Sequence, residues 1–317
     1  MKVLANDGIS QSGIEALEAG GFEVITTKVA QNQLENFINK NAVDAILVRS
    51  ATQVRQELID ACPSIKLIGR GGVGMDNIDV DYAINQGLHV INTPNASSSS
   101  VAELVFAHLF GMVRYLHQTN REMPLEGDTR FKDLKKDFGS GTELRGKTLG
   151  IIGLGRIGKE VAKIGLGIGM EVIASDEFIE KELINIPFFN GQSVDIEIES
   201  QPLENILKKS DFITMHVPSQ DAYIIGKDQL EVMKEGVGII NAARGGVIDE
   251  IALVAAIDSG KVRYAGLDVF ESEPTPEIQL LMNPDISFTP HIGAATVEAQ
   301  DRIGKELASQ IIELLSE

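Results

Sequence analysis

The sequence predicts an α/β fold built from two doubly wound parallel sheets, each in a domain of its own. Short runs rich in β-branched residues, bounded by Gly, Asn or Pro, alternate with segments of helical periodicity. This alternation is typical of parallel strands joined by crossover helices. The runs form two series, separated by a long apolar segment that starts in the serines at 97–100. A chain of 317 residues has room for two domains of ordinary size.

The first series predicts a small domain over residues 1–95. Its strands are expected near 3–5, 23–26, 45–48, 67–69 and 90–92, and its helices near 12–19, 34–39 and 80–86. The second series predicts a larger domain over residues 96–290. The chain from 291 to 317 is expected to return to the first domain, with one helix over about 297–315.

The larger domain is expected to open with one helix from about 97 to 120, followed by a charged loop over 121–145. Six strands come next, near 148–152, 172–175, 212–215, 238–241, 265–269 and 286–289. Six parallel strands are the number found in a Rossmann sheet, the doubly wound sheet that binds dinucleotides.

The charge balance argues against nucleic-acid and membrane partners. The chain has 28 Lys and Arg against 46 Asp and Glu, a formal net charge of −18, and no basic run offsets it locally. Such a surface repels phosphate backbones and anionic lipid headgroups. The longest apolar stretch, 101–113, is interrupted by Glu103 and His108 and is shorter than the roughly 20 residues of a membrane span. A single Cys62 and a start without a secretory pattern favour the cytoplasm.

A glycine loop at 153–158 predicts the cofactor site. The sequence GLGRIG follows a predicted strand and leads directly into a helix. In this setting Gly153 allows a tight turn, Gly155 lets the backbone approach a pyrophosphate, and Gly158 lets helix and strand pack closely. Asp176 ends the next strand, where its carboxylate can bind the ribose hydroxyls and repel a 2′-phosphate. The pattern therefore predicts NAD rather than NADP.

A second loop at 69–74 has the same glycine pattern but not its context. The sequence GRGGVG also follows a strand, yet the next helix is expected only near Asp79, and the following strand ends at Asn92 with no acid. We therefore expect no dinucleotide at this loop. Its amides, beside Arg70, could instead form a nest that binds an anion.

Three residues just beyond the ends of different predicted strands are the candidates for chemistry. Arg244 follows the fourth strand of the larger domain, Glu273 the fifth and His291 the sixth. An ionised Glu273 bonded to His291 would fix the imidazole tautomer and favour the protonated ring. Arg244 could clamp a carboxylate and polarise the neighbouring carbonyl. Beside a nicotinamide, this trio fits hydride transfer at the carbon that bears the oxygen. We interpret the other histidines, His89, His108, His117 and His216, as structural.

Four segments of the chain carry a pattern specific to one family. They are GLGRIG at 153–158, NAARGGVID at 241–249, GLDVFESEP at 266–274 and PHIGAAT at 290–296. Together they resemble the D-isomer-specific 2-hydroxyacid dehydrogenases, and the resemblance extends over nearly the whole chain. It implies a Rossmann cofactor domain, a smaller flavodoxin-like substrate domain, NAD as the cofactor, and Arg244, Glu273 and His291 as the catalytic residues. Three further segments are most similar to the members that oxidise D-3-phosphoglycerate: VRSAT at 48–52, GRGGVGMDNID at 69–79 and NTPN at 92–95.

The resemblance also implies which residues bind the ligands. For the cofactor these are Gly153, Gly155, Arg156, Ile157, Gly158, Asp176, Val217, Ala242, Asp268, Gly293 and Ala294. Arg156 and Ile157 are expected at the pyrophosphate, and Asp268 near the nicotinamide. For a small anionic substrate they are Arg49, Arg70, Gly72, Val73 and Gly74, and no metal is expected. Val73 and Val217 both stand where Thr is common in the family, so the hydroxyl contacts expected there are absent.

The resemblance implies the NAD-dependent oxidation of D-3-phosphoglycerate to 3-phosphohydroxypyruvate as the expected reaction. A phosphorylated substrate entering a protein of charge −18 needs fixed cations, and Arg49 and Arg70 would supply them. A glyoxylate or hydroxypyruvate reductase, or another 2-hydroxyacid dehydrogenase, is the close alternative. A dinucleotide-sensing corepressor of the same fold is an alternative of another class. The acidic segment 178–201 has no assigned function, and the regulatory domain of many members is not expected after 296.

The long apolar helix also predicts assembly. Apolar residues cover more than one face of 101–116, so we expect the helix to be buried either between domains or at a dimer contact. A homodimer through helix 98–120 is the expected state. The chain passes between the predicted domains near Asn95 and near Pro290. Two such crossings are expected to form a hinge that lets the substrate domain close and exclude water.

Overall fold

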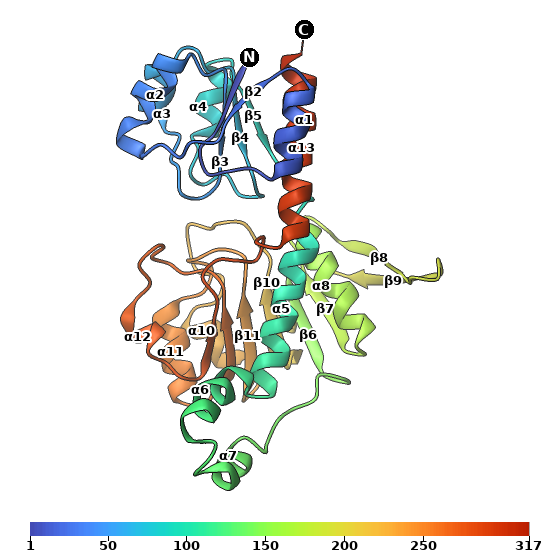
Figure 1. The fold of residues 1–317 in the computed structure, drawn as a ribbon. Helices are drawn as coiled ribbons and strands as arrows, with labels where there is room; N and C mark the ends of the chain where they lie inside the picture. Colours follow the sequence, from blue (N-terminus) through green and yellow to red (C-terminus); the bar gives the residue numbers. More distant parts are fainter. Residues whose placement is uncertain (317) are drawn as a thin grey trace. The chain divides into compact units, whose positions relative to one another are not determined.

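The computed structural model describes residues 1–316, which divide into two compact units (Figure 1). Unit 1 comprises residues 1–100 and the chain from 294 onward, and unit 2 comprises residues 101–293. The domain boundaries expected from the sequence, after residues 95 and 290, lie five and three residues earlier. Each unit is a parallel sheet with an apolar core on both faces, as the sequence predicted.

Unit 1 is built on a five-stranded parallel sheet with the order β2-β1-β3-β4-β5, which is the flavodoxin-like order. The strands are β1 (Lys2–Ala5), β2 (Glu23–Ile25), β3 (Ala45–Val48), β4 (Leu67–Arg70) and β5 (His89–Asn92). The central strand β3 is buried along its whole length. A strand covered on both faces needs apolar side chains on both, which explains why its sequence, AILV, shows no alternation.

The helices of unit 1 cover both faces of this sheet. They are α1 (Gln11–Ala19), η1 (Gln31–Gln33), α2 (Leu34–Asn41), α3 (Gln56–Ala61), α4 (Val80–Asn85) and α13 (Val297–Leu315). Helices α1 and α13 pack against each other on one face, where Leu17, Leu307 and Ile311 are buried (Figure 1). Helices α2, α3 and α4 cover the other face through Leu34 and Ile59. The last helix of the chain therefore completes the core of the first unit.

Unit 2 contains the predicted six-stranded parallel sheet, in the order β13-β12-β11-β10-β6-β7. Its strands are β6 (Thr148–Ile152), β7 (Glu171–Ser175), β10 (Phe212–Met215), β11 (Val237–Asn241), β12 (Val262–Leu267) and β13 (Ile286–Phe288). The chain leaves β6 for β7 on one side and later adds β10 on the other side. The direction of winding thus changes at β6, which is where a sheet of this kind opens its ligand crevice.

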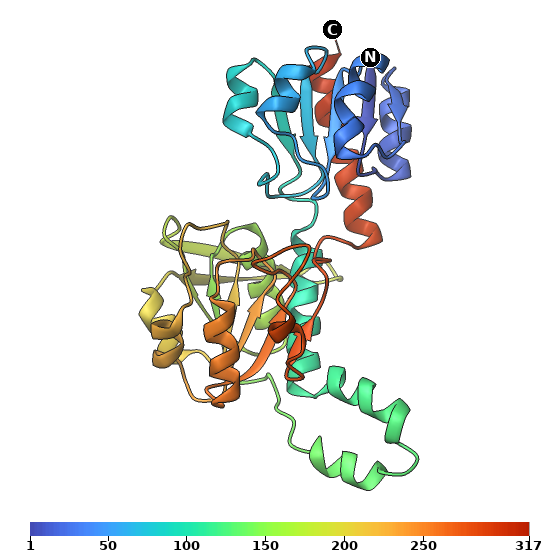
Figure 2. The same ribbon diagram turned by 90° about the vertical axis from the view of Figure 1, so that its left-hand side faces the viewer.

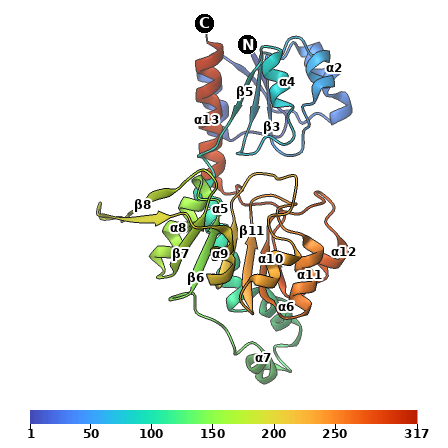
Figure 3. The ribbon, with the colours of Figure 1, turned by 180° about the vertical axis from the view of Figure 1, so that it is seen from behind.

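Helices cover both faces of this second sheet. They are α5 (Ser98–Val113), α8 (Arg156–Gly167), α9 (Leu203–Lys209), α10 (Lys227–Val232), α11 (Glu250–Asp258) and α12 (Ile278–Leu281). Helices α5 and α8 share one core with the sheet, and α9, α10 and α11 share the other (Figure 3). Among the described residues, no helix is long and apolar enough to cross a membrane.

The single helix expected over 97–120 is wrong in its extent. Helix α5 ends at Val113, and Tyr115 adopts a left-handed conformation with φ 55° before α6 (Leu116–Glu126) begins. The segment expected to be a charged loop then contains α7 (Phe131–Asp137), and α6 and α7 extend from the body of unit 2 (Figure 2). A left-handed break at a non-glycine residue leaves no clear mark in the sequence, which explains the error.

The apolar character of α5 also has a different cause from the one expected. Leu109 and Met112 are buried in the core of unit 2, with 0% and 1% of their surface exposed. Most of the apolar surface that the sequence assigned to a partner is therefore covered by the helix's own unit. Phe110 and Leu116 remain about half exposed.

The acidic segment 178–201 folds as an antiparallel hairpin of β8 (Lys181–Pro187) and β9 (Ser193–Glu199) (Figure 3). Ile184 and Ile198 point into the core beneath α8. The other residues of the two strands are mostly exposed. Ser200, at the end of the hairpin, bonds the backbone of Asp176 through its hydroxyl. The hairpin therefore leaves the sheet directly after the predicted ribose ligand and returns beside it.

Candidate active site

The glycine loop between β6 and α8 has the geometry that its sequence predicts. Gly153 lies in the left-handed region with φ 96°, and a Cβ there would meet the carbonyl oxygen of His216. A Cβ on Gly158 would meet the carbonyl oxygen of Gly153. Both glycines are therefore required by the protein's own packing. Gly155 differs, because a Cβ there would meet nothing within 4 Å.

This open space at Gly155 is where a dinucleotide fits. Gly155 is the N-cap of α8, a helix of 12 residues, and no side chain caps its first turn. The first backbone N–H groups of the helix, at Arg156 and Ile157, carry partial positive charge and can receive a pyrophosphate. The residues present therefore match the needs of the cofactor that the sequence predicts.

Asp176 lies beside this loop, although its carboxylate is more engaged than the sequence suggested. One oxygen accepts the N–H of Leu154 at 2.7 Å, and the other accepts the N–H groups of Phe178 and Ile179 at 2.9 and 3.0 Å. These bonds fix the side chain against the glycine loop. A carboxylate has about four lone-pair sites, so one remains for a ribose hydroxyl. Val217 and Ala242 follow the neighbouring strands β10 and β11 at the same edge of the sheet.

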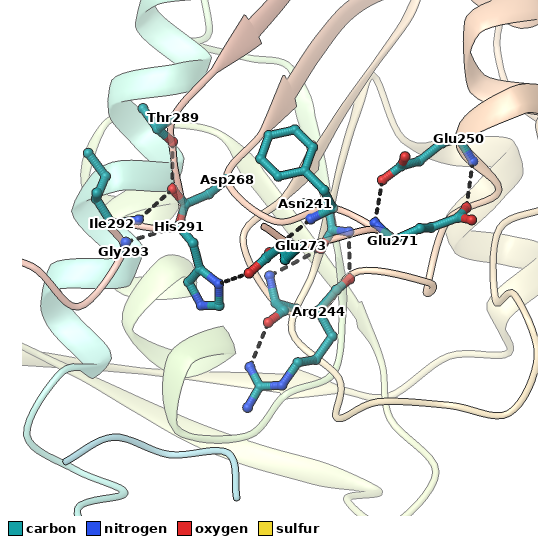
Figure 4. A network of polar contacts seen from close by, with 12 residues as sticks. Asn241, Arg244, Glu250, Asp268, Glu271, Glu273, Thr289, His291, Ile292 and Gly293 are labelled. Carbon is teal, nitrogen blue, oxygen red and sulfur yellow. Dashed lines mark hydrogen bonds and ion pairs between the residues drawn. The ribbon is translucent and has the colours of Figure 1, made fainter. Parts of the chain in front are cut away.

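His291 and Glu273 form the pair that the sequence predicted. Nδ1 of His291 lies 2.7 Å from Oε2 of Glu273, and the two side chains are 42% and 34% exposed (Figure 4). The other carboxylate oxygen, Oε1, accepts the N–H of Phe270 at 3.0 Å. Since the carboxylate can only accept, Nδ1 carries the hydrogen in this bond and Nε2 is left to exchange a proton with a substrate.

Opposing influences act on the Glu273 carboxyl. Partial burial raises its pKa, but the hydrogen bond and charge of His291, the N–H of Phe270 and the charge of Arg244 outweigh it. The pKa of Glu273 therefore lies below its ordinary value, so the carboxylate is ionised near neutral pH. An ionised partner stabilises the protonated imidazole that forms when His291 takes up a proton.

Arg244 is positioned by the end of β11. Asn241, the last residue of that strand, donates from Nδ2 to the carbonyl of Arg244 at 2.8 Å and accepts the N–H of Ala243 at 3.1 Å. The guanidinium donates from Nη1 to the carbonyl of Ala243 at 2.6 Å. The guanidinium of Arg244 and the pair of Glu273 and His291 thus occupy one rim of unit 2, as predicted (Figure 4).

Asp268 organises the loop that carries His291. Its buried carboxylate accepts the hydroxyl of Thr289 at 2.6 Å and the N–H groups of Ile292 and Gly293 at 2.8 and 2.9 Å. Between these anchors, His291 adopts a left-handed backbone with φ 54°. This conformation is uncommon outside glycine and persists only where surrounding bonds impose it. The structure therefore assigns Asp268 a contact that the resemblance did not imply.

His108, which the sequence analysis interpreted as structural, lies directly behind this carboxylate. Its Nε2 is 3.0 Å from the Thr289 hydroxyl and its Nδ1 is 2.9 Å from the Ser287 hydroxyl. Because Thr289 donates to Asp268, it must accept from Nε2, which fixes the tautomer of His108. Burial lowers the pKa of His108, so the ring is neutral. Nothing local in the sequence links a helix residue to the end of β13, so this support could not be predicted.

The predicted substrate residues meet one another in unit 1. Asn77 donates from Nδ2 to the carbonyl of Arg49 at 2.7 Å and accepts Nε of Arg70 at 3.2 Å. Arg49 also bonds Gln300 through its guanidinium, and burial lowers its pKa against the opposing charge of Asp7. Asn77 and Gln300 are functional candidates that the sequence analysis did not single out. Their bonds to Arg49 span 28 and 251 residues of sequence, so no local pattern could have shown them.

The loop at 69–74 differs from the first glycine loop, as expected. After β4 the chain runs without helix to α4, which starts at Val80. A Cβ on Gly72 would meet the guanidinium of Arg70, so the side chain of this arginine lies along the loop. The carbonyl of Val73 accepts Nδ2 of Asn92 at 2.7 Å, and Gly74 follows it in irregular backbone. Ala294 is the last of the cofactor residues that the resemblance implies. Its backbone carbonyl accepts Nε2 of Gln300 at 2.7 Å.

His216 fits its structural interpretation. Its Nε2 lies 2.9 Å from the hydroxyl of Thr214, and burial lowers its pKa to about 3, so the ring is neutral. No group of three His, Cys, Asp or Glu side chains suited to a metal ion occurs among residues 1–316.

Known proteins are similar to this chain in sequence and in fold. The family model described as D-isomer specific 2-hydroxyacid dehydrogenase, NAD binding domain, matches residues 106–293, more than half of the chain. A D-3-phosphoglycerate dehydrogenase of Methanocaldococcus jannaschii is 40% identical over 99% of this chain and 57% of the relative. A hydroxypyruvate reductase of Thermotoga maritima is 41% identical over 99% of this chain and 98% of the relative. The solved structure of a D-lactate dehydrogenase from Aquifex aeolicus, complexed with NAD and lactic acid, has a TM-score of 0.75 at 30% identity, covering 98% of this chain and 94% of that one.

The chain belongs to the D-isomer-specific 2-hydroxyacid dehydrogenases, a family of NAD-dependent oxidoreductases. The family and the cofactor predicted from the sequence are therefore confirmed. The matched region contains both the glycine loop and the three catalytic candidates. The chain spans just over half the length of the M. jannaschii relative.

Proposed function

We propose that the protein catalyses the NAD-dependent oxidation of D-3-phosphoglycerate to 3-phosphohydroxypyruvate, the entry step of serine synthesis. The observation that carries the reaction type is the contact of 2.7 Å between His291 and Glu273, with Arg244 on the same rim. Several D-3-phosphoglycerate dehydrogenases of 36% to 41% identity, among them the M. jannaschii relative, support the substrate.

The chemistry of the site follows from its proton carrier and its cation. NAD, held by the glycine loop and Asp176, would supply the acceptor for the hydride that leaves C2 of the substrate. Nε2 of His291 takes the proton of the C2 hydroxyl as the carbonyl forms, and Glu273 stabilises the resulting imidazolium. Arg244 holds the substrate carboxylate by charge-assisted hydrogen bonds and polarises the developing carbonyl. In the reverse direction His291 returns the proton to the carbonyl oxygen.

We assign the recognition of the substrate phosphate to unit 1. Asn77 accepts Nε of Arg70 and donates to the backbone carbonyl of Arg49, so one side chain holds both arginine residues in place. In a protein with a net charge of −18, such fixed cations offset the repulsion that a phosphorylated substrate meets. The amides of Gly72, Val73 and Gly74 would supply further donors.

A hydroxypyruvate reductase is the second candidate. The observation that favours it is the T. maritima relative, which matches over 98% of its own length. The valines at 73 and 217 also lack the hydroxyl groups that the phosphoglycerate pattern commonly provides.

A panel of substrates distinguishes the two functions. The values of kcat/KM are measured with NAD for D-3-phosphoglycerate, D-glycerate, D-lactate and 2-hydroxyglutarate, and with NADH for hydroxypyruvate and glyoxylate. The proposal predicts the highest kcat/KM for D-3-phosphoglycerate. A preference for hydroxypyruvate would replace it with the second candidate.

We further propose that the protein is a cytoplasmic homodimer whose partners are small molecules rather than nucleic acid or membranes. Exposed apolar residues along α5, α6 and α7 support the dimer: Phe110, Leu116, Met123, Leu125 and Phe131. The buried thiol of Cys62, whose pKa burial raises to about 11, is compatible with a reducing compartment. Sedimentation at micromolar concentration should give a dimer, and a monomer would contradict this assembly.

A further inference from the structure

Two glutamates outside the catalytic trio form a reciprocal contact in unit 2. The backbone N–H of Glu250 donates to Oε1 of Glu271 at 3.0 Å, and the backbone N–H of Glu271 donates to Oε1 of Glu250 at 2.8 Å (Figure 4). Glu250 is the first residue of α11, so its N–H has no partner within the helix. Each side chain thus satisfies the backbone of the other, and we call this pair the glutamate clasp.

The clasp joins the two loops that carry Arg244 and Glu273. Arg244 stands six residues before Glu250, in the loop between β11 and α11, and Glu273 stands two residues after Glu271, in the loop after β12. The same loops also touch at Gly245, where a Cβ would meet the carbonyl oxygen of Phe270. Two contacts therefore set the register of one loop against the other.

The clasp also lies next to the bond that orients Glu273. The N–H of Phe270, which holds Oε1 of Glu273, belongs to the residue directly before Glu271. A shift of the backbone at Glu271 would therefore move this donor and the carboxylate that it holds. On its outer side, Glu271 accepts the hydroxyl of Tyr223 at 3.2 Å through Oε2, which gives the clasp a third anchor.

We propose that Glu250 and Glu271 are positioning residues, whose reciprocal bonds fix Glu273 and Arg244 in the geometry that the reaction needs. This inference rests on the proposed oxidation of a 2-hydroxy acid. Neither glutamate belongs to the predicted catalytic trio, and both act through the residues next to them. A misplacement of reacting groups by about 1 Å can cost on the order of 100-fold in rate, so a distant bond of this kind is sufficient to matter.

The clasp requires an acceptor oxygen at each position rather than a negative charge. Burial raises the pKa of Glu250, and the charges of Glu271, Glu277 and Glu273 raise it further, although the N–H of Glu271 opposes them. The negative charge of Glu250 therefore destabilises the folded state, while its carboxylate oxygen accepts the hydrogen bond from the N–H of Glu271. A glutamine keeps the oxygen without the charge, and a methionine of similar length removes both.

The test compares these two replacements at both positions. Glu271→Met and Glu250→Met should lower kcat/KM by roughly 10- to 100-fold and leave the Kd of NADH within about twofold, because the glycine loop is untouched. Glu271→Gln and Glu250→Gln should recover most of that loss. Glu277→Met is the matched control, since it removes a charge that acts on Glu250 without removing an acceptor from the clasp. It should behave as wild type.

A second readout needs no substrate. The pKa of the Glu273 carboxyl, followed by NMR and assigned with Glu273→Gln, should be higher in each Met variant than in the matching Gln variant. Both replacements remove the charge, but only the Met variant should move Glu273 away from the Phe270 donor and the charge of Arg244. The exposed position of Glu271 makes Glu271→Met the variant that folds if Glu250→Met does not. If the wild type oxidises none of the panel substrates, the proposed function fails. The pKa of Glu273 in the variants still tests whether the clasp positions Glu273.

A double-mutant cycle measures the contact itself. Each single variant breaks one of the two bonds. The combined Glu250→Met and Glu271→Met variant should lose less activity than the two single losses added as free energies, since the loss of one bond already loosens the contact that the other bond needs. The inference is overturned if the Met variants keep both kcat/KM and the pKa of Glu273, or if the Gln variants fall as far as the Met variants.

Discussion

The loops at 153–158 and 69–74 share one glycine pattern but differ in local structure. Both follow a parallel strand. The first turns at once into α8 and leaves open space at Gly155, whereas the second continues without helix to Val80 and is filled at Gly72 by the side chain of Arg70. The comparison shows that one glycine spacing is compatible with two different local structures. A dinucleotide site also requires a helix N-terminus and an acidic residue after the next strand.

The difference between the loops implies a division of labour. The loop at 153–158 and the catalytic candidates all belong to unit 2, so the cofactor and the chemistry are assigned there. The loop at 69–74 belongs to unit 1 and presents two linked arginines. Variants that affect one loop should therefore leave the function of the other intact.

The largest effect is expected from His291→Asn. Loss of the proton carrier should lower kcat by about 10² to 10⁴, the usual range for general acid–base catalysis. The Kd of NADH, measured by fluorescence titration, should stay near the wild-type value. A variant that keeps near wild-type kcat would show that another group carries the proton.

Gly155→Ala should have the next largest effect, on cofactor binding. The new methyl group would occupy the open space assigned to the pyrophosphate, at a cost of about 2 kcal/mol, or roughly 30-fold in the Kd of NADH. Gly167→Ala is the matched control, because it lies in the same helix and its Cβ would also meet nothing within 4 Å. Equal effects of the two variants on the Kd, measured by calorimetry, would contradict the assignment.

Asp176→Ala is expected to change the cofactor preference by a smaller factor. Loss of one charge-assisted bond to the ribose should weaken NAD by about 1.5 kcal/mol, or roughly tenfold, and relieve the repulsion of the 2′-phosphate of NADP. Glu177→Ala, at the neighbouring carboxylate, is the control. Unchanged discrimination between NAD and NADP in Asp176→Ala would remove this residue from the site.

The smallest effect concerns the pH dependence of stability. Because folding lowers the pKa of Glu273 below its ordinary value of 4.5, its ionised form stabilises the fold above that pH. This contribution is lost as the pH falls through the lowered value. The advantage of the wild type over Glu273→Gln in free energy of unfolding, from urea titrations, should therefore shrink between neutral pH and pH 3. A constant difference would contradict the lowered pKa.

The sequence was sufficient for both sheets because buried parallel strands such as AILV at 45–48 need apolar residues on both faces. It also placed Arg244, Glu273 and His291 on one rim, since each follows a strand that ends at that edge. The hairpin of β8 and β9 does alternate in polarity, with Ile184 inward and Leu183 outward, but its many acidic residues obscured the pattern.

Contacts between residues far apart in the chain could not be predicted from the sequence. The bond of Asn77 to Arg49, the support of Asp268 by Thr289 and His108, and the glutamate clasp each join residues that no spacing rule connects. Apolar composition was also ambiguous for α5, because a core helix and an interface helix need the same residues. The structure resolves this ambiguity for Leu109 and Met112, which are buried within unit 2.

The division of labour is tested most directly by Arg70→Met and Gly155→Ala measured side by side, with the Kd of NADH and the KM of D-3-phosphoglycerate determined for each. Loss of one charged contact to the phosphate should raise the KM by roughly 10- to 100-fold in Arg70→Met, about 1.5–3 kcal/mol, and leave the Kd of NADH unchanged. Gly155→Ala should raise the Kd of NADH. A Kd of NADH that rises as much in Arg70→Met as in Gly155→Ala, with an unchanged KM of D-3-phosphoglycerate, would contradict this division between the two loops.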